Sequence, residues 1–328
     1  MNFLKNKKIL ITGGTGSLGK ALIRNLEKSS CDMACFSRDE GKQALLFADN
    51  PSVNCIIGDI RDYDKLYWAF RTFRPDYVIH AAALKRIDDM EIHPDECIKT
   101  NILGSQNVLN ACLNARVKKC ILISTDKACE PINVYGSTKF IAERLFSHSD
   151  YSSVECAFSS IRYGNVIASR GSFIPLFLEW IKAGKQIRLT SEKMTRFLFT
   201  LDDAATAVLL ALQHSQGGEV FVPKINSYTI PHCILALGAL TGKTPTTSII
   251  GLRPGEKLHE DMLSTSELDF TYEVPHSNLL QIRPHRAARK YQDFPQYTGP
   301  PLNSSLWAAD DEESINELIP LFERGLEN

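Results

Sequence analysis

The stretch that decides the fold is Lys8-Ile9-Leu10-Ile11-Thr12, followed at once by Gly13-Gly14-Thr15-Gly16-Ser17-Leu18-Gly19. The first segment is an apolar run typical of a buried strand, and residues 20–26 have the apolar spacing of a helix. Glycines between such a strand and helix permit a tight turn and let the backbone approach a pyrophosphate, which the helix N-terminus can bind. The stretch therefore predicts a dinucleotide-binding loop, with cofactor contacts from Gly13, Thr15, Gly16, Ser17, Leu18 and Gly19.

Outward from this loop, short apolar runs alternate with amphipathic stretches through the first half of the chain. Strands are expected at residues 33–36, 54–57, 77–80 and 120–124. Because near-continuous apolar strands need helices on both faces, we predict an α/β fold with a Rossmann-like, doubly wound parallel sheet. Residues 1–165 would form this dinucleotide-binding domain, with about 197–222 returning to it, and 166–196 and 223–328 would form a smaller α+β substrate lobe.

The composition excludes several classes of protein. The 328 residues carry 37 Lys and Arg against 38 Asp and Glu, a formal net charge of −1, so we expect neither nucleic acid nor a membrane as partner. No apolar run approaches the ~18 residues of a membrane span, and no secretory signal is recognised. Nine cysteines without a CxxC pair indicate reduced thiols, and eight histidines without ligand spacing predict no metal site. A cytoplasmic protein is expected.

Further cofactor contacts are expected where the next strands end. The second strand ends at Ser37-Arg38, where a hydroxyl and a guanidinium suit a ribose 2′-phosphate, and the acidic Asp39 comes one position late for a 2′-hydroxyl. NADP is therefore preferred over NAD. The other expected contacts are Asp59 and Ile60 at the adenine, and Ala81, Ala82 and Ala83 at the ribose and nicotinamide.

A tyrosine and a lysine four residues apart form the second decisive motif. Tyr135 and Lys139 would lie on one face of a helix. An ammonium beside a phenol is expected to lower the tyrosine pKa from ~10, as a general base for an alcohol requires. Thr125-Asp126-Lys127 directly follows the strand expected at 120–124.

These motifs resemble the extended short-chain dehydrogenase/reductase superfamily and, within it, the inverting UDP-N-acetylglucosamine 4,6-dehydratases of pseudaminic-acid and related bacterial surface-sugar pathways. The resemblance covers roughly residues 5–285. Its motifs stand at residues 11–17, 37–40, 80–85, 96–101, 124–128, 162–166, 169–172, 194–197 and 253–260. Retaining relatives carry Asp-Glu where this chain has Asp126-Lys127, so the lysine favours inversion at C5.

The resemblance implies a redox-neutral reaction with tightly bound, recycled NADP. Tyr135, assisted by Lys139, would take the proton of the sugar 4-hydroxyl, which Thr125 aligns, while hydride passes from C4 to NADP⁺. Lys127 would remove the C5 proton and Asp126 would protonate the leaving 6-hydroxyl. Hydride would return to C6, and Lys127 would reprotonate C5 on the opposite face. For these roles the Lys127 pKa should be lowered by burial or by neighbouring cations, and Asp126 should stay protonated.

The resemblance also implies a UDP-sugar site and a homo-oligomer, either a dimer or a hexamer. Arginine side chains are suited to the oxygens of a diphosphate. The implied substrate contacts are Asn165, Arg170, Thr190, Arg196, Arg253 and Glu256 around the UDP, with Lys85 and Thr125 at the sugar. Lys85, Asn101, Tyr135 and Lys139 complete the implied cofactor contacts.

Other functions stay open at this stage. A nucleotide-sugar 4-epimerase shares the fold, the cofactor and the Tyr–Lys pair but needs no Asp-Lys pair, and a C5-epimerase or reductase is a further alternative. A non-catalytic NADP-sensing protein would keep the glycines without needing Tyr135 and Lys139. The residues leave the sugar's 2-substituent, the downstream pathway and the oligomer count undetermined.

Overall fold

The glycine-rich loop connects a buried strand to a helix, as predicted. The computed structural model describes residues 2–149, 155–169, 171–285, 291–309 and 312–326. Strand β1 spans Lys8–Thr12, helix α1 spans Ser17–Glu27, and the next strand, β2, spans Asp32–Ser37. The Gly13 backbone N–H donates to the carbonyl of Phe36, so the loop starts where β1 and β2 end. This places the loop at the carboxyl edge of a sheet.

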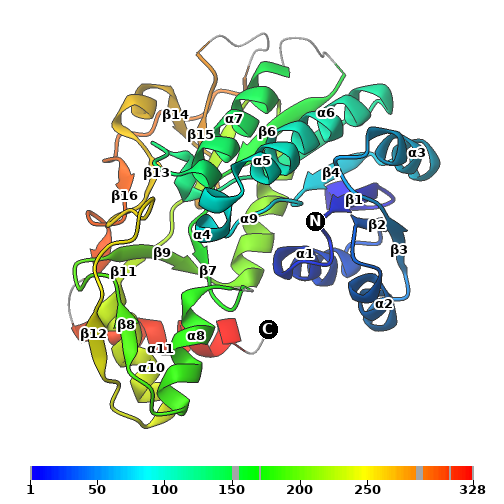
Figure 1. Cartoon of the computed structure of the whole chain (residues 1–328). Helices are drawn as coiled ribbons and strands as arrows, with labels where there is room; N and C mark the ends of the chain where they lie inside the picture. The colour runs from blue at the N-terminus through cyan, green and yellow to red at the C-terminus, as the bar shows by residue number, and fades with distance from the viewer. Residues whose placement is uncertain (1, 150–154, 170, 286–290, 310–311, 327–328) are drawn as a thin grey trace.

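A large sheet runs through the molecule (Figure 1). Its further strands are β3 (Val53–Ile57), β4 (Tyr77–His80), β5 (Lys119–Ile123), β6 (Ala157–Ile161), β10 (Val220–Pro223), β14 (Thr271–Glu273) and β15 (Leu279–Ile282). Within the described part of the chain the strand order is β14-β15-β10-β6-β5-β4-β1-β2-β3. All neighbours from β10 to β3 are parallel, which confirms the predicted doubly wound sheet. The strand order reverses between β1 and β4, where such folds bind ligands.

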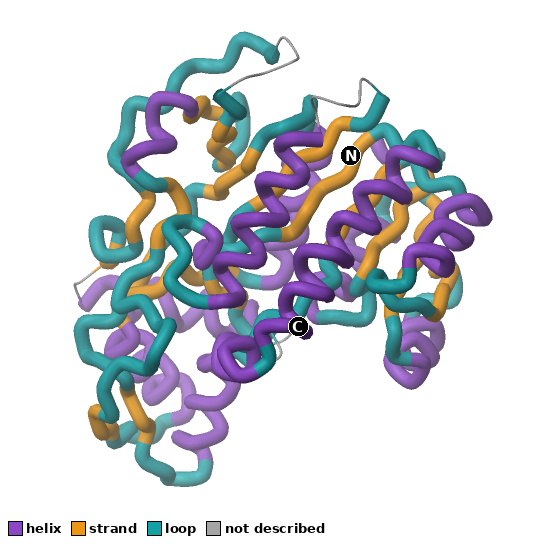
Figure 2. The backbone as a smooth tube through the Cα atoms, turned by 45° about the horizontal axis from the view of Figure 1, so that its top comes forward, coloured by secondary structure: helices purple, strands orange, loops and turns teal. Residues whose placement is uncertain are grey.

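Helices cover both faces of this sheet because successive strand side chains point to opposite sides. Leu10 packs in a buried cluster with side chains of α3 (Tyr63–Phe73), α6 (Gly104–Asn114) and α7 (Val134–Ser149). Ile9 and Ile11 pack on the other face with α1, α2 (Glu40–Asp49) and α9 (Leu201–His214). Figure 2 shows the helices running alongside the strands. Burial on both faces explains why these strands read as continuous apolar runs.

A second group of elements gathers at the lower left of Figure 1. It contains the strands β7 (Asn165–Val166), β8 (Ile187–Leu189), β9 (Thr195–Phe199), β11 (Ser227–Thr229), β12 (Thr247–Ile249) and β17 (Ala308–Ala309), and the helices α8 (Phe173–Lys182), α10 (Ile230–Thr241) and α11 (Glu312–Leu326). The order β17-β11-β9-β7 forms one sheet, and β12 pairs with β8. Ile174, Leu237 and Phe322 from the three helices belong to one buried cluster, so this group has its own apolar core.

Short elements connect these layers. They are 3₁₀ turns at Asn2–Leu4, Asp126–Ala128 (η3) and Thr265–Phe270 (η4), helices α4 (Ile87–Ile92) and α5 (Pro94–Cys97), a π-helix at Ile98–Leu103 (η2), and the antiparallel strands β13 (Asp261–Leu263) and β16 (Leu302–Asn303). A π-helical turn within a helical run often marks a functional site.

The predicted division into lobes can be compared with this topology. Helix α9 packs on α1, and β10 lies beside β6, so most of the segment 197–222 returns to the large sheet. Its first residues differ, because β9 pairs with β7 and β11 in the second sheet. Within 223–328, β14 and β15 extend the large sheet beside β10. Where the lobes begin and end stays a prediction.

The interior holds the reduced thiols that the sequence indicates. All nine cysteines are free, and seven of them are buried. Burial raises the pKa of Cys35 to about 11, so this thiol stays protonated at neutral pH. In the part of the chain that is described, no helix combines the length and the apolarity needed to cross a membrane.

Candidate active site

The glycine loop has the shape of a dinucleotide cradle. Gly13 has a φ of +71°, and a Cβ there would lie 2.8 Å from the Ala82 nitrogen. A Cβ on Gly19 would lie 2.4 Å from the Gly14 Cα, so α1 packs directly against the loop. Gly16 is the N-cap of α1 and provides no side-chain cap, and the N-terminus of a helix attracts anionic groups. These residues fit a dinucleotide pyrophosphate. Thr15 is buried, while Ser17 and Leu18 are partly exposed.

Arg38 and Asp39, which directly follow β2, have different partners. Arg38 Nη1 lies 3.5 Å from Asp59 Oδ2, and its side chain is 53% exposed. Asp39 instead caps α2, accepting from the backbone N–H of Lys42, and also pairs with the Lys42 ammonium. Burial raises the pKa of Asp59, but hydrogen bonds and charge from Arg61, with the charge of Arg38, outweigh it and hold this pKa below its ordinary value. Asp59 is thus an ionised anchor for two arginines.

Asn101 holds the loop after β4 in place. Its side chain accepts from the Leu84 N–H and donates to the Leu84 carbonyl, both at 2.9 Å, and it also donates to Thr138 Oγ1 at 3.1 Å. The π-helix that carries Asn101 therefore links the 81–85 loop to α7. Of the other predicted cofactor residues, Ser37 and Ile60 are buried, Ala81 and Ala82 are partly exposed, and Ala83 and Lys85 are exposed.

The catalytic candidates meet because α7 packs closely on η3. A Cβ on Gly136 would lie 2.2 Å from the Lys127 carbonyl oxygen, so only glycine allows this approach of the two backbones. Tyr135 and Lys139 are both buried, at 9% and 3% exposure. The Thr125 hydroxyl donates to Asp126 Oδ1 at 2.9 Å. All five predicted catalytic residues thus lie at the junction of β5, η3 and α7.

Burial controls the protonation of the Tyr–Lys pair. It raises the pKa of Tyr135 to about 12, and the charge of Lys127 and a hydrogen bond with Thr125 counteract it only in part. The expected lowering of the Tyr135 pKa by Lys139 is therefore wrong, since desolvation of the phenolate outweighs nearby cations. Burial also lowers the pKa of Lys139 to about 8, so Lys139 is still mostly cationic at neutral pH.

Lys127 lies between two buried carboxylates. Its Nζ is 3.0 Å from Asp126 Oδ1 and 3.1 Å from Glu260 Oε1. Burial alone would lower the Lys127 pKa, but the charges of Asp126 and Glu260 outweigh burial and the cation Arg196, so this pKa lies above its ordinary value. The expectation of a lowered Lys127 pKa is therefore wrong. At rest Lys127 is therefore an ammonium that is paired with the carboxylates of Asp126 and Glu260.

Glu260 is the site residue that sequence reasoning missed. It directly precedes β13, its side chain is 2% exposed, and its backbone N–H donates to Ser304 Oγ at 2.8 Å. The only signal in the sequence is that Glu260 ends the motif at 253–260. Folding brings this motif to η3, which no local spacing could reveal.

Arg196, predicted to bind the diphosphate, is buried and already holds protein groups. Its guanidinium donates to the backbone carbonyls of Thr195, Lys257 and Leu258 at 2.7–3.1 Å. Its Nε also lies 3.8 Å from Glu260 Oε1. Arg196 thus fixes the segment that carries Glu260. A direct contact with substrate stays a prediction.

Arg253, which is half-exposed, forms an ion pair with the largely buried Glu256 at the start of the same segment. Arg253 Nη2 lies 2.9 Å from Glu256 Oε1, and Arg253 Nη1 lies 3.0 Å from Asp88 Oδ2 on α4. Asn133 donates to the Gly255 carbonyl at 2.8 Å and so ties this loop to the start of α7. The loop and α4 therefore meet beside the Tyr135 end of α7.

Asn165 and Thr190, two further predicted substrate residues, lie in the second group of elements. Asn165 on β7 has a buried Oδ1 for which the described residues provide no hydrogen-bond partner. Thr190 follows β8, and its hydroxyl points to Met194 Sδ at 3.7 Å. Arg170 lies outside the described residues. The orphaned Asn165 oxygen is consistent with a ligand at this position.

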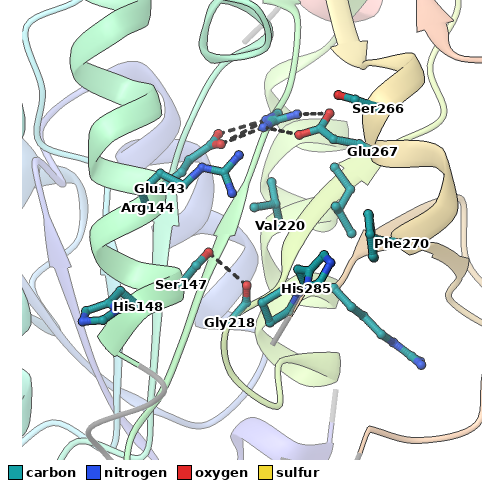
Figure 3. Close-up of a pocket in the computed structure, with 14 residues that line it drawn as sticks. Glu143, Arg144, Ser147, His148, Gly218, Val220, Ser266, Glu267, Phe270 and His285 are labelled. Atoms are coloured by element: carbon teal, nitrogen blue, oxygen red, sulfur yellow. Dashed lines mark hydrogen bonds and ion pairs between the residues drawn. The ribbon is translucent and has the colours of Figure 1, made fainter. Parts of the chain in front are cut away.

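A buried ionic triad lies behind the catalytic turn. Arg162 is 1% exposed and pairs with Glu143 Oε2 at 2.8 Å and with Glu267 Oε1 at 2.9 Å. Glu143 on α7 and Glu267 on η4, both labelled in Figure 3, line a cavity of about 620 Å³. The hydroxyl of Ser124, which precedes Thr125, donates to Glu143 Oε1 at 2.5 Å. The triad thus fixes the end of β5 against α7.

Loss of the Arg162 charge is expected to destabilise the protein strongly. Arg162→Met would leave Glu143 and Glu267 buried without their cation, and breaking such a pair typically costs ~3–5 kcal/mol of unfolding free energy. Denaturant unfolding followed by circular dichroism measures this loss. Adding Glu143→Gln and Glu267→Gln removes the unpaired charges and should recover part of it. A loss below ~1 kcal/mol for Arg162→Met would contradict the role of the triad.

Fold and site together define the class of protein. The parallel sheet with a glycine cradle at its β1–α1 turn is a Rossmann fold. With the buried Tyr–Lys pair on a following helix, it defines a short-chain dehydrogenase/reductase.

Comparisons with known proteins place the chain within this class. A family model described as "Polysaccharide biosynthesis protein" matches residues 9–282, and the chain belongs to that family. A UDP-N-acetylglucosamine 4,6-dehydratase (inverting) of Campylobacter jejuni is 41% identical, covering 94% of this chain and 97% of the relative. A UDP-glucose 4-epimerase of Rickettsia massiliae is 42% identical over 80% of this chain and 79% of the relative. The X-ray structure of Pen from Bacillus thuringiensis matches with a TM-score of 0.88 and 35% identity, covering 98% of this chain and 99% of that one.

Proposed function

We propose that this chain is a UDP-N-acetylglucosamine 4,6-dehydratase that inverts C5. The observation that carries the proposal is the contact of Lys127 with Asp126 beside the buried Tyr135. A Tyr–Lys pair serves any oxidation at C4, whereas loss of water across C5 and C6 needs a further acid and base. The name of the C. jejuni relative supports the same reaction.

Tyr135 would begin the reaction as the base at the 4-hydroxyl. A bound nicotinamide dinucleotide supplies oxidation at C4 and the later reduction at C6. Because burial raises the Tyr135 pKa to about 12, its phenolate depends on nearby cations, and the charge of Lys127 acts in this direction. Lys139, four residues along α7, would add a second cation. Thr125 would align the hydroxyl, and its own hydroxyl ties the Tyr135 site to Asp126.

The loss of water would begin with a proton transfer inside the Asp126–Lys127 pair. The Lys127 ammonium passes a proton over the 3.0 Å contact to Asp126, giving a neutral amine and a carboxylic acid without a change in net charge. The amine then takes the C5 proton, and Asp126 gives its proton to the leaving 6-hydroxyl. Both groups return to their resting charges as water leaves. Lys127 is then cationic and can give a proton back to C5.

Mass spectrometry after mixing the protein with UDP-N-acetylglucosamine tests the proposal. Loss of one water supports a dehydratase. An unchanged mass with inverted C4 configuration would instead support an epimerase, the activity in the name of the R. massiliae relative. Since an epimerase has no use for the Asp126–Lys127 pair, the contact between these residues favours the dehydratase.

We further propose that the cofactor is NADP, with Arg38 at its 2′-phosphate. The cap formed by Asp39 supports this, because the carboxylate that directly follows Arg38 already accepts from the Lys42 N–H. Arg38→Ala should weaken NADP⁺ binding roughly tenfold or more and leave NAD⁺ binding nearly unchanged, since a hydrogen bond to a charged group contributes ~1.5–3 kcal/mol. Calorimetric titration with both dinucleotides measures the ratio.

Arg61→Ala is the matched control for Arg38. Arg61 also pairs with Asp59, at 2.7 Å, but its other partner is Glu96, at 2.8 Å. Its removal should leave the ratio of NADP⁺ to NAD⁺ affinity as in the wild type. If Arg38→Ala weakened both dinucleotides equally, Arg38 would have a structural role and the preference for NADP would be wrong.

The remaining assignments belong to the same proposal. Residues 1–165 with most of 197–222 would bind the cofactor, and the other segments would bind the UDP-sugar through Asn165, Thr190, Arg253 and Glu256. The enzyme would act as a cytoplasmic homo-oligomer, as its resemblance implies. The family description supports a role in polysaccharide biosynthesis. A product that enters a surface-sugar pathway such as that of pseudaminic acid would follow from the resemblance alone.

A further inference from the structure

We infer that Glu260 is a positioning residue of the dehydration step, holding the Lys127 ammonium in place and in its charged resting state through their 3.1 Å contact. This inference rests on the proposed function, because the step it affects is the proton chemistry at C5. Glu260 acts through Lys127.

Glu260 contacts the Lys127 ammonium in the same way as Asp126 does. Asp126 and Glu260 lie at nearly equal distances from Lys127 Nζ, and their side chains are only 1% and 2% exposed. Each uses one oxygen for the ammonium. Their other oxygens, Asp126 Oδ2 and Glu260 Oε2, are buried without a hydrogen-bond partner in the described part of the chain. Asp126 therefore has an oxygen available for the leaving 6-hydroxyl, while Glu260 holds the Lys127 ammonium in place.

Glu260 also joins Lys127 to the predicted substrate arginines. Charges alternate in sign along Lys127, Glu260, Arg196, Glu256 and Arg253, with separations of 3.1, 3.8, 3.9 and 2.9 Å between successive charged atoms. Without Glu260, two cations would face each other with no anion between them. Since unlike neighbours stabilise each charge, Glu260 lets both Lys127 and Arg196 stay buried and ionised.

The pH dependence of Lys127 follows from the groups that face it. These are Asp126 on its own turn, Glu260 before β13, Arg196 on β9 and Tyr135 on α7. The two carboxylates raise the Lys127 pKa, and Arg196 lowers it. Glu260→Gln removes one carboxylate and leaves the cation, so the Lys127 pKa falls. The Asp126–Lys127 pair then loses its shared proton to solvent at lower pH. Because Asp126 needs that proton for the leaving 6-hydroxyl, the fall of water loss at high pH moves in the same direction.

The first experiment measures the protonation of Lys127 without turnover. Carbon-13 labelled lysine is titrated by NMR in the holoenzyme, and Lys127→Arg assigns the signal. Glu260→Gln should move the Lys127 midpoint to lower pH by at least one unit, and Glu260→Asp should move it back toward the wild type because the charge returns. Glu219→Gln is the matched control, since Glu219 is a fully buried carboxylate far along the chain that accepts from Ser159 and Gln281. It should leave the midpoint unchanged.

The second experiment separates the steps of turnover. With UDP-N-acetylglucosamine, Glu260→Gln should still reduce bound nicotinamide, because Tyr135 is untouched, but should lose water at least tenfold more slowly at neutral pH. Glu260→Asp should restore the position of the pH profile. An equal loss in both steps with an unmoved profile would mean that Glu260 only supports the fold, and would overturn the inference.

The two experiments distinguish failure of the inference from failure of the proposed function. If the wild type removes no water but Glu260→Gln still shifts the Lys127 titration, the proposed reaction is wrong and the role of Glu260 as the partner of Lys127 stands. If the wild type removes water and neither the titration nor the pH profile moves, the inference is wrong and the reaction stands.

Discussion

Replacement of Tyr135 by phenylalanine is expected to slow oxidation at C4 by ~10²–10⁴-fold, the range that a positioned general base contributes. The change removes only the hydroxyl, and the ring stays in the apolar cluster with Met90 and Cys97. Cofactor affinity and secondary structure should therefore remain as in the wild type. Rapid mixing with UDP-N-acetylglucosamine, followed by nicotinamide absorbance in a single turnover, measures the first step directly.

Tyr77→Phe is the matched control for this variant. Tyr77 is a buried tyrosine at the amino end of β4, so its hydroxyl lies at the other edge of the sheet from the glycine loop. It should oxidise C4 at the wild-type rate. A Tyr135→Phe protein with near wild-type activity would transfer the role of base to another residue and would refute the assignment of the site.

The part of the site that depends on local spacing could be predicted from the sequence. The glycine loop lies between a strand and a helix that are adjacent in the chain, and Gly19 closely approaches the backbone of Gly14, only five residues before it. Tyr135 and Lys139 share one face of α7 because they are four residues apart. The apolar runs predict the parallel strands, because burial on both faces removes any alternation of polar side chains.

The electrostatic setting of the site could not be predicted in the same way. Glu260 reaches Lys127 only because β13 packs near η3, and that contact reverses the expected direction of the Lys127 pKa. The Tyr135 pKa depends on burial, which the i,i+4 spacing does not report. Likewise, the short strands β14 and β15 have no pattern that shows which sheet they join. Charge balance and burial depend on contacts between distant segments, so they appear only in the folded chain.

Lys127→Ala is expected to abolish water loss while bound nicotinamide is still reduced. The variant removes the only amine that lies between Asp126 and Glu260 among the described residues, so C5 loses its base and later its proton donor. Tyr135 and Lys139 remain in place, so the first half of the reaction should still proceed to the 4-ketone, but more slowly, because the Tyr135 phenolate loses the charge of Lys127. With a substrate deuterated at C4, oxidation without elimination would appear as deuterated, reduced nicotinamide and a UDP-sugar that has lost no water.

The wild-type product formed in heavy water tests inversion itself. In heavy water the resting Lys127 ammonium carries deuterium. After it has passed one deuteron to Asp126 and taken the C5 proton, it still has two N–D bonds and can exchange with solvent, so it should deliver deuterium to C5. NMR of the product should show that deuterium together with inverted C5 configuration. Lys127→Arg keeps a cation between Asp126 and Glu260 but cannot act as a base, so it should also fail to remove water. A deuterated product with retained configuration would contradict the inverting assignment even if water loss were observed, because the proton would have returned to the face from which it left.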